Sequence, residues 1–269
     1  MNMSNPLEAL TLVLRIAAAG VLLITAETLV RRNVLRDQEL MSWSVGSLRQ
    51  GYLVRKPLGG LLDFALRYPN ICGLLALRAV LAAAIALGPQ AITTSPWCLC
   101  PMALLLLLFA IRNPFGQDGA DQLALIIFVG AAAATLAGGR AINVYLWFIA
   151  LQVCLSYATA GIAKATARGW WDGSFLVGVA ATRIYGHEAL AGLLARRPTL
   201  SRTLSLFLVT WESVFPLALV APRPVAYAMI ASGVLFHLSN GILMGLNDFF
   251  WLFVATYPAL FYCIANRGW

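Results

Sequence analysis

The chain has 269 residues, of which 61% are hydrophobic and only 11% are charged. Soluble domains carry about 25% charged residues, so this composition excludes a soluble globular protein and indicates a membrane protein surrounded by a lipid bilayer. The net charge is +8. Because Lys and Arg gather in two hydrophilic stretches, 31–69 and 164–202, we attribute this charge to membrane topology and expect no nucleic-acid partner.

Eight apolar stretches approach the roughly 20 residues that a membrane-spanning helix needs. They cover residues 7–30, 70–88, 96–111, 119–137, 141–163, 203–220, 225–245 and 248–265. Gly138 and Gly139 predict a tight turn between the fourth and fifth, and Pro222 and Pro224 a break between the sixth and seventh. The first stretch is too long for a signal peptide, so we expect a retained helix. The sequence therefore predicts an all-α, polytopic transmembrane bundle in a single domain, residues 1–269.

The two long loops are predicted to carry short helices at the membrane interface. In the first loop, apolar residues recur at helical spacing opposite Asp63 and Arg67; they are Leu58, Leu61, Leu62, Ala65 and Leu66. In the second loop, residues 175–194 predict a surface helix or a shallow re-entrant segment. With eight spans, the loops 31–69, 112–118, 164–202 and 246–247 share one side and hold most of the 19 Lys and Arg residues. The positive-inside rule places that side in the cytoplasm of a multi-pass cell-membrane protein.

The cysteines give little functional signal. Cys72, Cys154 and Cys263 lie in apolar stretches and are typical of small core residues. Cys98 and Cys100 form a Cys-x-Cys pair whose spacing leaves a disulfide or a metal site open beside a purely structural role. We predict no metal site.

Ionisable residues inside the spans need a reason, since each costs about 2.5–3.5 kcal/mol on insertion scales. Structural explanations exist for single residues. Lys164 can snorkel from a span end, Asp118 and Asp248 can cap helices, and Arg78 can pair with Glu212.

Two helix faces combine such polar groups with glycine, which indicates a lined cavity or a close helix contact. The first face holds Tyr157, Gly161 and Lys164, and the second holds His237, Asn240, Gly241 and Met244. Glu212 lies deep in its span and must find a donor or take up a proton. One buried pocket holding a Lys, a His, an Asn and a carboxylate would suit proton transfer.

Two pieces of the sequence resemble a known family. They are Tyr157-Ala-Thr-Ala-Gly-Ile-Ala-Lys164 with Gly169-Trp-Trp-Asp-Gly173, and Phe236-His-Leu-Ser-Asn240 with Gly241 and Phe249-Phe-Trp251; Trp211-Glu212 lies between them. Together they resemble the HTTM (horizontally transferred transmembrane) domain, over about residues 7–265. That domain is shared by vitamin K-dependent gamma-carboxylase and by a bacterial membrane protein that matures a sporulation-delaying toxin.

The resemblance implies roles for three residues. Lys164 matches the lysine regarded as the base that starts oxygenation of reduced vitamin K, and His237 and Asn240 match a polar pair that would orient substrate or stabilise an oxyanion. Two departures weaken the implied carboxylation: residues 118–122 contain no His, and we expect no part of residues 1–269 to correspond to the large peptide-holding domain of the carboxylase. The carboxylase also works on the lumenal side, whereas the charge count places Lys164 at the cytoplasmic face.

Two functions follow as expectations. The first is a membrane enzyme, a carboxylase-like lyase or a quinone-linked enzyme, with Lys164, His237 and Asn240 as catalytic residues. Supporting polar groups would be Tyr157, Glu212, Arg78, Asp121 and Asp172. A reduced quinone is its cofactor only by resemblance. The second is a non-catalytic accessory or maturation subunit that binds a peptide, a small soluble partner subunit or a lipid. A transporter is disfavoured because the chain shows no matching halves.

Overall fold

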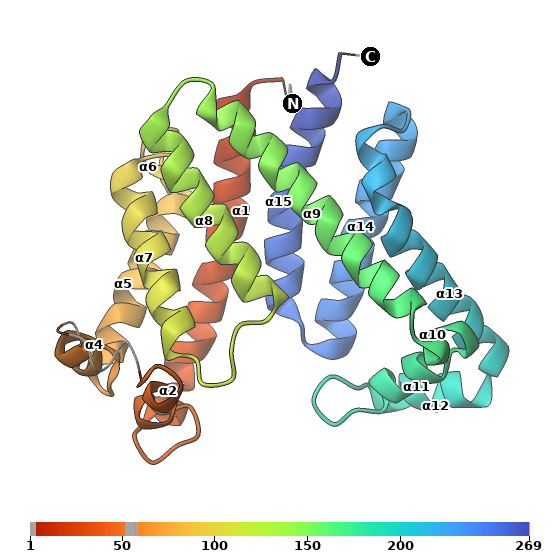
Figure 1. Ribbon diagram of the computed structural model, residues 1–269, viewed down its shortest axis with the longest axis horizontal. Helices are drawn as coiled ribbons and strands as arrows, with labels where there is room; N and C mark the ends of the chain where they lie inside the picture. The colour runs from red at the N-terminus through yellow and green to blue at the C-terminus, as the bar shows by residue number, and fades with distance from the viewer. Residues whose placement is uncertain (1–3, 52–56, 58, 269) are drawn as a thin grey trace. The chain divides into compact units, whose positions relative to one another are not determined.

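The computed structural model describes residues 4–51, 57 and 59–268, and all regular structure in these ranges is helical (Figure 1). The helices form two compact units. Unit 2 comprises Leu10–Tyr145, and unit 1 comprises the residues up to Ala9 together with those from Leu146 on. Helices α1 (Pro6–Val30) and α9 (Ala141–Ala165) contribute residues to both units. The single domain expected from the sequence stays a prediction.

Unit 2 is built from long apolar helices with short helices at their ends. Besides α1 and the start of α9, its elements are η1 (Arg32–Leu35), α2 (Trp43–Arg49), α4 (Gly59–Leu66), α5 (Asn70–Leu87), α6 (Gln90–Thr93), α7 (Pro96–Arg112) and α8 (Gly119–Ala137). Helix α7 packs against both α5 and α8. Two arginines inside the unit find oxygen partners: Arg15 Nη2 donates to the Gly88 carbonyl at 2.8 Å, and Arg78 Nε donates to Thr25 Oγ1 at 2.8 Å.

Unit 1 combines three long helices with a helical segment that is more polar. Besides most of α9, its elements are α10 (Arg168–Asp172), α11 (Ser174–Ala180), α12 (Glu188–Arg196), α13 (Pro198–Val214), η2 (Phe215–Leu219), α14 (Arg223–Met244) and α15 (Asn247–Asn266). The first half of α13 is polar for a structural reason. Its buried Ser201 and Ser205 donate hydrogen bonds to the Gly173 and Trp170 carbonyls and so tie α13 to the α10–α11 turn.

Six of the described helices are long and apolar enough to cross a membrane, namely α1, α5, α8, α9, α14 and α15. The chain is therefore an all-helical protein whose six apolar helices indicate several membrane crossings. Two expected spans fall short of this criterion. Helix α7 has only 17 residues, and the expected span 203–220 is divided between α13 and the 3-10 helix η2. Eight spans, and the loop orientation derived from them, stay predictions.

The expected helix boundaries are confirmed at three places. Asp118 caps α8, because its Oδ1 accepts a hydrogen bond from the Asp121 backbone N–H at 2.9 Å. Gly138 and Gly139 make the turn between α8 and α9 with φ values of +67° and +54°, a backbone region that favours glycine. Helix α14 begins directly after Pro222.

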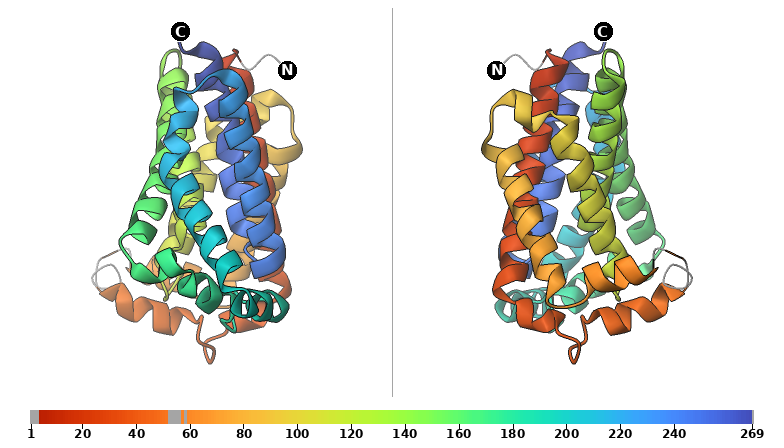
Figure 2. Two further views of the ribbon diagram at one scale, coloured as in Figure 1. Left: turned by 90° about the vertical axis from the view of Figure 1, so that its right-hand side faces the viewer. Right: turned by 90° about the vertical axis from the view of Figure 1, so that its left-hand side faces the viewer.

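The helix expected in residues 58–66 is present as α4, but its packed face is smaller than predicted, and its place at a membrane interface stays a prediction. Leu62 and Leu66 join a core cluster that includes Trp43 of α2, whereas Leu61 is 65% exposed; Leu58 lies outside the described residues. Asp63 accepts a hydrogen bond from Trp43 Nε1 at 3.0 Å, which connects α4 to α2, and a local one from Arg67 Nη2 at 3.2 Å. Figure 2 shows these short helices lying across the ends of the long helices of unit 2. In the second loop, the stretch expected as one surface or re-entrant segment forms two short helices, α11 and α12.

Candidate functional site in unit 1

A buried ion pair joins the end of α9 to α13. Lys164 Nζ lies 2.6 Å from Glu212 Oε2, and the side chains are 24% and 5% exposed, respectively. The ammonium group also lies 5.5 Å from the centroid of the Trp170 ring. The two helices can approach this closely because of Gly161, where an added Cβ would lie 2.5 Å from the backbone nitrogen of Ser213. The carboxylate predicted to need a donor has therefore found Lys164, and not Arg78.

Three polar side chains from α9, α14 and α15 form a hydrogen-bonded chain inside unit 1. His237 Nε2 on α14 lies 2.7 Å from the Tyr157 hydroxyl on α9, which lies 2.7 Å from the Tyr257 hydroxyl on α15. All three residues are at most 3% exposed. Gly233, one turn before His237, makes room for this chain, because a Cβ there would collide with the Tyr257 hydroxyl. The arrangement is a continuous hydrogen-bonded chain across three helices.

The second ring nitrogen of His237 is unusual. Its Nδ1 is buried and has no hydrogen-bond partner among the residues that the structure describes. Buried polar atoms without a partner are rare and call for an explanation. The imidazole is held by packing instead, since its ring stacks on Phe253 with centroids 4.3 Å apart. Nδ1 can therefore gain or lose a proton without breaking a hydrogen bond to the described residues.

Aromatic side chains surround the hydrogen-bonded chain of His237, Tyr157 and Tyr257. The Tyr157 ring packs against Phe215, Trp211 and Phe253 at centroid distances of 4.0, 5.2 and 5.6 Å. Trp211, which packs on the Tyr157 ring, directly precedes Glu212 on α13. The ion pair and the hydroxyl chain thus belong to one region of unit 1. Tyr157 and Lys164 are about 10 Å apart along α9, at 1.5 Å per residue.

Asn240 is not part of the hydroxyl chain. It lies on an apolar groove of about 480 Å³ that α13 and α14 form with α11 and α12. Two further polar residues, Ser232 and Ser239, line this groove. Its inner wall includes Trp211 and Phe236, and the ring centroids of these residues lie 5.2 Å from Tyr157 and 5.0 Å from His237. A thin aromatic wall therefore separates Asn240 and the groove from the hydroxyl chain.

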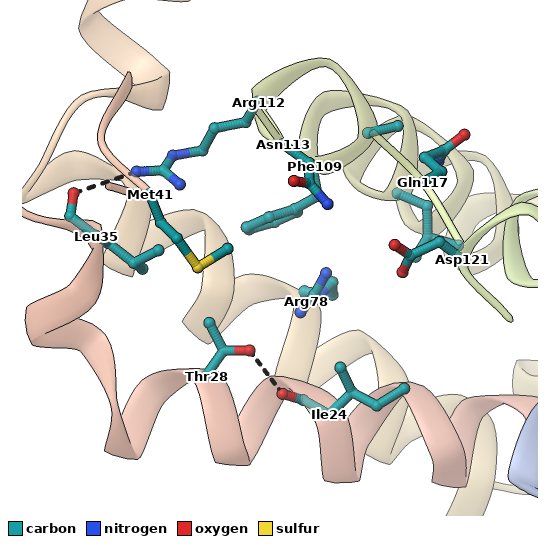
Figure 3. A pocket seen from close by; sticks show the side chains of 12 residues that line it. Ile24, Thr28, Leu35, Met41, Arg78, Phe109, Arg112, Asn113, Gln117 and Asp121 are labelled. Atoms are coloured by element: carbon teal, nitrogen blue, oxygen red, sulfur yellow. Dashed lines mark hydrogen bonds between the residues drawn. The ribbon is translucent and has the colours of Figure 1, made fainter. Parts of the chain in front are cut away.

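Three expected supporting residues lie elsewhere. Arg78 and Asp121 line a cavity of unit 2 (Figure 3). Asp172 is exposed at the end of α10, where its carboxylate accepts a hydrogen bond from the Ser174 backbone N–H at 2.8 Å. Hydrogen bonds from Ser174 also hold the pKa of this carboxyl below its ordinary value. Asp172 therefore stabilises the α10–α11 turn.

The sequence reasoning missed Tyr257. A signal for it exists, since Tyr257 stands at the middle of α15 and not at an end, where interfacial tyrosines gather. A hydroxyl at such a position needs a partner inside the bundle.

The described residues show neither a group of metal ligands nor a disulfide between Cys98 and Cys100. Within the described ranges, no three His, Cys, Asp or Glu side chains lie close enough to hold a metal ion. Cys98 and Cys100 are free thiols on α7, where residues two apart do not face each other. Comparisons with models of known protein families, with curated proteins and with solved structures find no match to this chain.

Proposed function

We propose that the chain is a multi-pass enzyme of the cell membrane, of the HTTM or gamma-carboxylase-like type, which performs proton transfer in unit 1. The observation that carries the proposal is the buried chain from His237 through Tyr157 to Tyr257, with the Lys164–Glu212 pair in the same region. Ionisable groups inside a membrane are costly and rare, and those that occur mark proton relays and substrate pathways. The basic long loops would face the cytoplasm, as the positive-inside rule predicts.

The ion pair can supply a base. Transfer of one proton from the Lys164 ammonium to the Glu212 carboxylate, across their 2.6 Å hydrogen bond, yields a neutral amine and a carboxylic acid. This step removes two charges from a buried site, where charge is expensive. The free amine can then accept a proton from a bound substrate, and Glu212 holds the first proton until the site is reset.

The hydroxyl chain can move a second proton. If His237 carries its proton on Nδ1, Nε2 accepts from the Tyr157 hydroxyl, which accepts from Tyr257. In the other tautomer, each of these hydrogen bonds reverses its direction. Passing from the second state to the first takes up one proton at Nδ1 and releases one from the Tyr257 hydroxyl, without moving a heavy atom. A water molecule or a bound substrate would have to deliver the proton at Nδ1, and another would have to accept it at Tyr257. Stacking on Phe253 holds the imidazole in position in both states.

The groove beside the chain fits a reduced quinone. Apolar residues form most of its lining, with Asn240, Ser232 and Ser239 as polar groups, a composition typical of sites for amphipathic ligands. A bound reduced quinone would supply an acidic hydroxyl and reducing equivalents. The groove residues would hold it, and Asn240 would orient its polar end. Because Trp211 and Phe236 stand between the groove and the hydroxyl chain, these side chains would have to move before the quinone could meet Lys164 or His237.

The test uses the purified protein in lipid nanodiscs, supplied with a reduced naphthoquinone and oxygen, with quinone oxidation as the readout. We expect Lys164→Ala and His237→Ala each to lower turnover by at least about 100-fold, the usual contribution of a general acid or base. Arg168→Gln is the matched control, since it removes a positive charge from an exposed residue four positions from Lys164. Unchanged turnover in Lys164→Ala at normal protein levels would eliminate the base assignment. A wild-type protein that leaves the reduced quinone untouched would refute the quinone-linked reaction.

One observation favours the accessory function as a second candidate. Leu61 and Phe64 on α4 are 65% and 67% exposed, and they offer an apolar surface to a peptide, a partner subunit or a lipid. Photocrosslinking from position 64 to a co-expressed protein, with equal yield in Lys164→Ala, would support this function. Crosslinks to lipid alone would assign the surface to the bilayer.

A further inference from the structure

A partly open cavity in unit 2 gathers charged and amide side chains from three long helices and a loop (Figure 3). Its volume is about 150 Å³, comparable with a cavity that accommodates benzene. Arg78 of α5, Asp121 of α8 and Arg112 at the end of α7 line it, with Asn113 and Gln117 from the following loop. None of these residues belongs to the site in unit 1.

Arg78 is fixed in place but retains donors. Its side chain is buried, Nε donates to Thr25 Oγ1, and the guanidinium carbon lies 4.1 Å from the centroid of the Phe109 ring. A guanidinium group has five N–H donors, and the bond to Thr25 uses one. Figure 3 shows the guanidinium directed into the cavity. The remaining donors are thus arranged for a planar or tetrahedral anion.

Arg112 provides a second positive charge that is already oriented. Its Nε and Nη2 donate to the Leu66 and Leu35 carbonyls at 3.0 and 3.2 Å, so the guanidinium is anchored beside the cavity. The Asp121 carboxylate lies within electrostatic range of Arg78. Two arginines and one aspartate leave an excess of one positive charge. The cavity therefore suits a monoanion that also carries hydrogen-bond donors for Asp121, Asn113 and Gln117.

A phosphodiester with a hydroxyl-bearing substituent has this chemistry. Phosphate matches the arginine donors, and hydroxyls can donate to a carboxylate or an amide oxygen. The surroundings indicate a lipid source. The cavity lining includes Thr28 near the end of α1 and Arg112 at the end of α7. In Figure 1 these helix ends lie beside α2 and α4, where Leu48 and Phe64 are largely exposed. Basic pockets between membrane helices are known sites for anionic headgroups.

We propose that this cavity binds the phosphoglycerol group of an anionic phospholipid, with Arg78 on the phosphate and Asp121 on the glycerol hydroxyls. Arg112, whose guanidinium is directed to the Leu35 carbonyl (Figure 3), adds a positive charge beside the cavity without contacting the phosphate. Soluble glycerol phosphate carries the same phosphate and glycerol hydroxyls, but as a phosphomonoester with nearly one more negative charge at neutral pH, so the test includes it as a second source. The site is independent of the proton-transfer function proposed for unit 1.

The experiment is a titration of the full-length protein in neutral detergent, followed by native mass spectrometry. The probes are short-chain phosphatidylglycerol, phosphatidic acid and phosphatidylcholine, and free glycerol phosphate as a competitor. We expect phosphatidylglycerol to bind most tightly. Arg78→Gln should weaken its binding by about 10- to 100-fold, the value of hydrogen bonds to a charged group. Arg32→Gln is the control, because it removes an exposed charge of unit 2 that does not line the cavity. It should change the affinity for phosphatidylglycerol by no more than about twofold.

Two further variants keep the test decisive if Arg78→Gln does not fold. Arg78→Lys preserves the charge but loses the forked donor geometry, so it should also weaken phosphatidylglycerol binding. Asp121→Asn should reduce the preference for phosphatidylglycerol over phosphatidic acid. Competition by free glycerol phosphate would identify a soluble ligand of the same chemistry, and its absence would identify the lipid. Equal binding of phosphatidylglycerol and phosphatidylcholine, or equal losses in Arg78→Gln and Arg32→Gln, would overturn the proposal.

Discussion

The Lys164–Glu212 pair should respond unequally to the loss of either partner. Lys164→Met leaves a carboxylate that is 5% exposed without its cation. That carboxylate must remain charged or take up a proton, and both cost free energy. Breaking a buried pair in this way costs about 3–5 kcal/mol. Glu212→Gln leaves a lysine that is 24% exposed at a helix end and can reorient towards the interface. Glu212→Gln should therefore destabilise the protein by no more than the roughly 1.5–3 kcal/mol of one charged hydrogen bond.

The assay is thermal unfolding in a mild detergent, followed by the fraction of protein that remains monodisperse. At about 2–4 °C per kcal/mol for a chain of this size, Lys164→Met should lower the midpoint by roughly 6–20 °C and Glu212→Gln by less. The double variant Lys164→Met with Glu212→Met replaces the pair by apolar groups. It should recover most of the loss, because such replacements are often neutral.

The double variant also separates stability from function. It should be folded but inactive if the pair supplies the base, and folded and active if the pair is structural. Equal destabilisation by the two single variants, or additive losses in the double variant, would refute the reasoning, because a direct pair must show coupling.

Two further predictions concern the hydroxyl chain. Gly233→Ala should destabilise the protein by roughly 1–3 kcal/mol, because the new methyl group meets the Tyr257 hydroxyl; Gly192→Ala, where nothing lies within 4 Å, is the control and should not destabilise in the same thermal assay. Tyr257→Phe should cost about 1 kcal/mol because Tyr157 keeps its contact with His237. Tyr157→Phe should cost more, since the imidazole then loses its Nε2 partner while Nδ1 already has none among the described residues. Equal losses in the two Tyr variants would contradict the proposed order of the chain.

Most helix positions could be predicted from the sequence because a long run of apolar residues is enough to identify a membrane helix. The fourth expected span, 119–137, agrees with α8 at both ends. The sixth does not agree, since α13 begins at Pro198 with polar residues whose role, bonding to the α10–α11 backbone, depends on tertiary contacts. A pattern read along one helix carries no information about such contacts.

The candidate site shows the same division. Helical spacing correctly placed Tyr157, Gly161 and Lys164 along one side of α9, because that spacing is a local property. It could not reveal that Glu212 contacts Lys164, since this contact depends on the position at which α13 packs along α9. Sequence reasoning likewise grouped Arg78 with these residues, whereas Arg78 lines a cavity formed within unit 2.

Gly161 contains no functional group, and yet it determines how close two reactive ones can come. Any side chain at this position would push the backbone at Ser213 outward and carry the neighbouring carboxylate with it. A graded series of small residues at position 161 would therefore work as a spacer of adjustable length. It would tune proton sharing between lysine and glutamate while leaving both of them chemically unaltered.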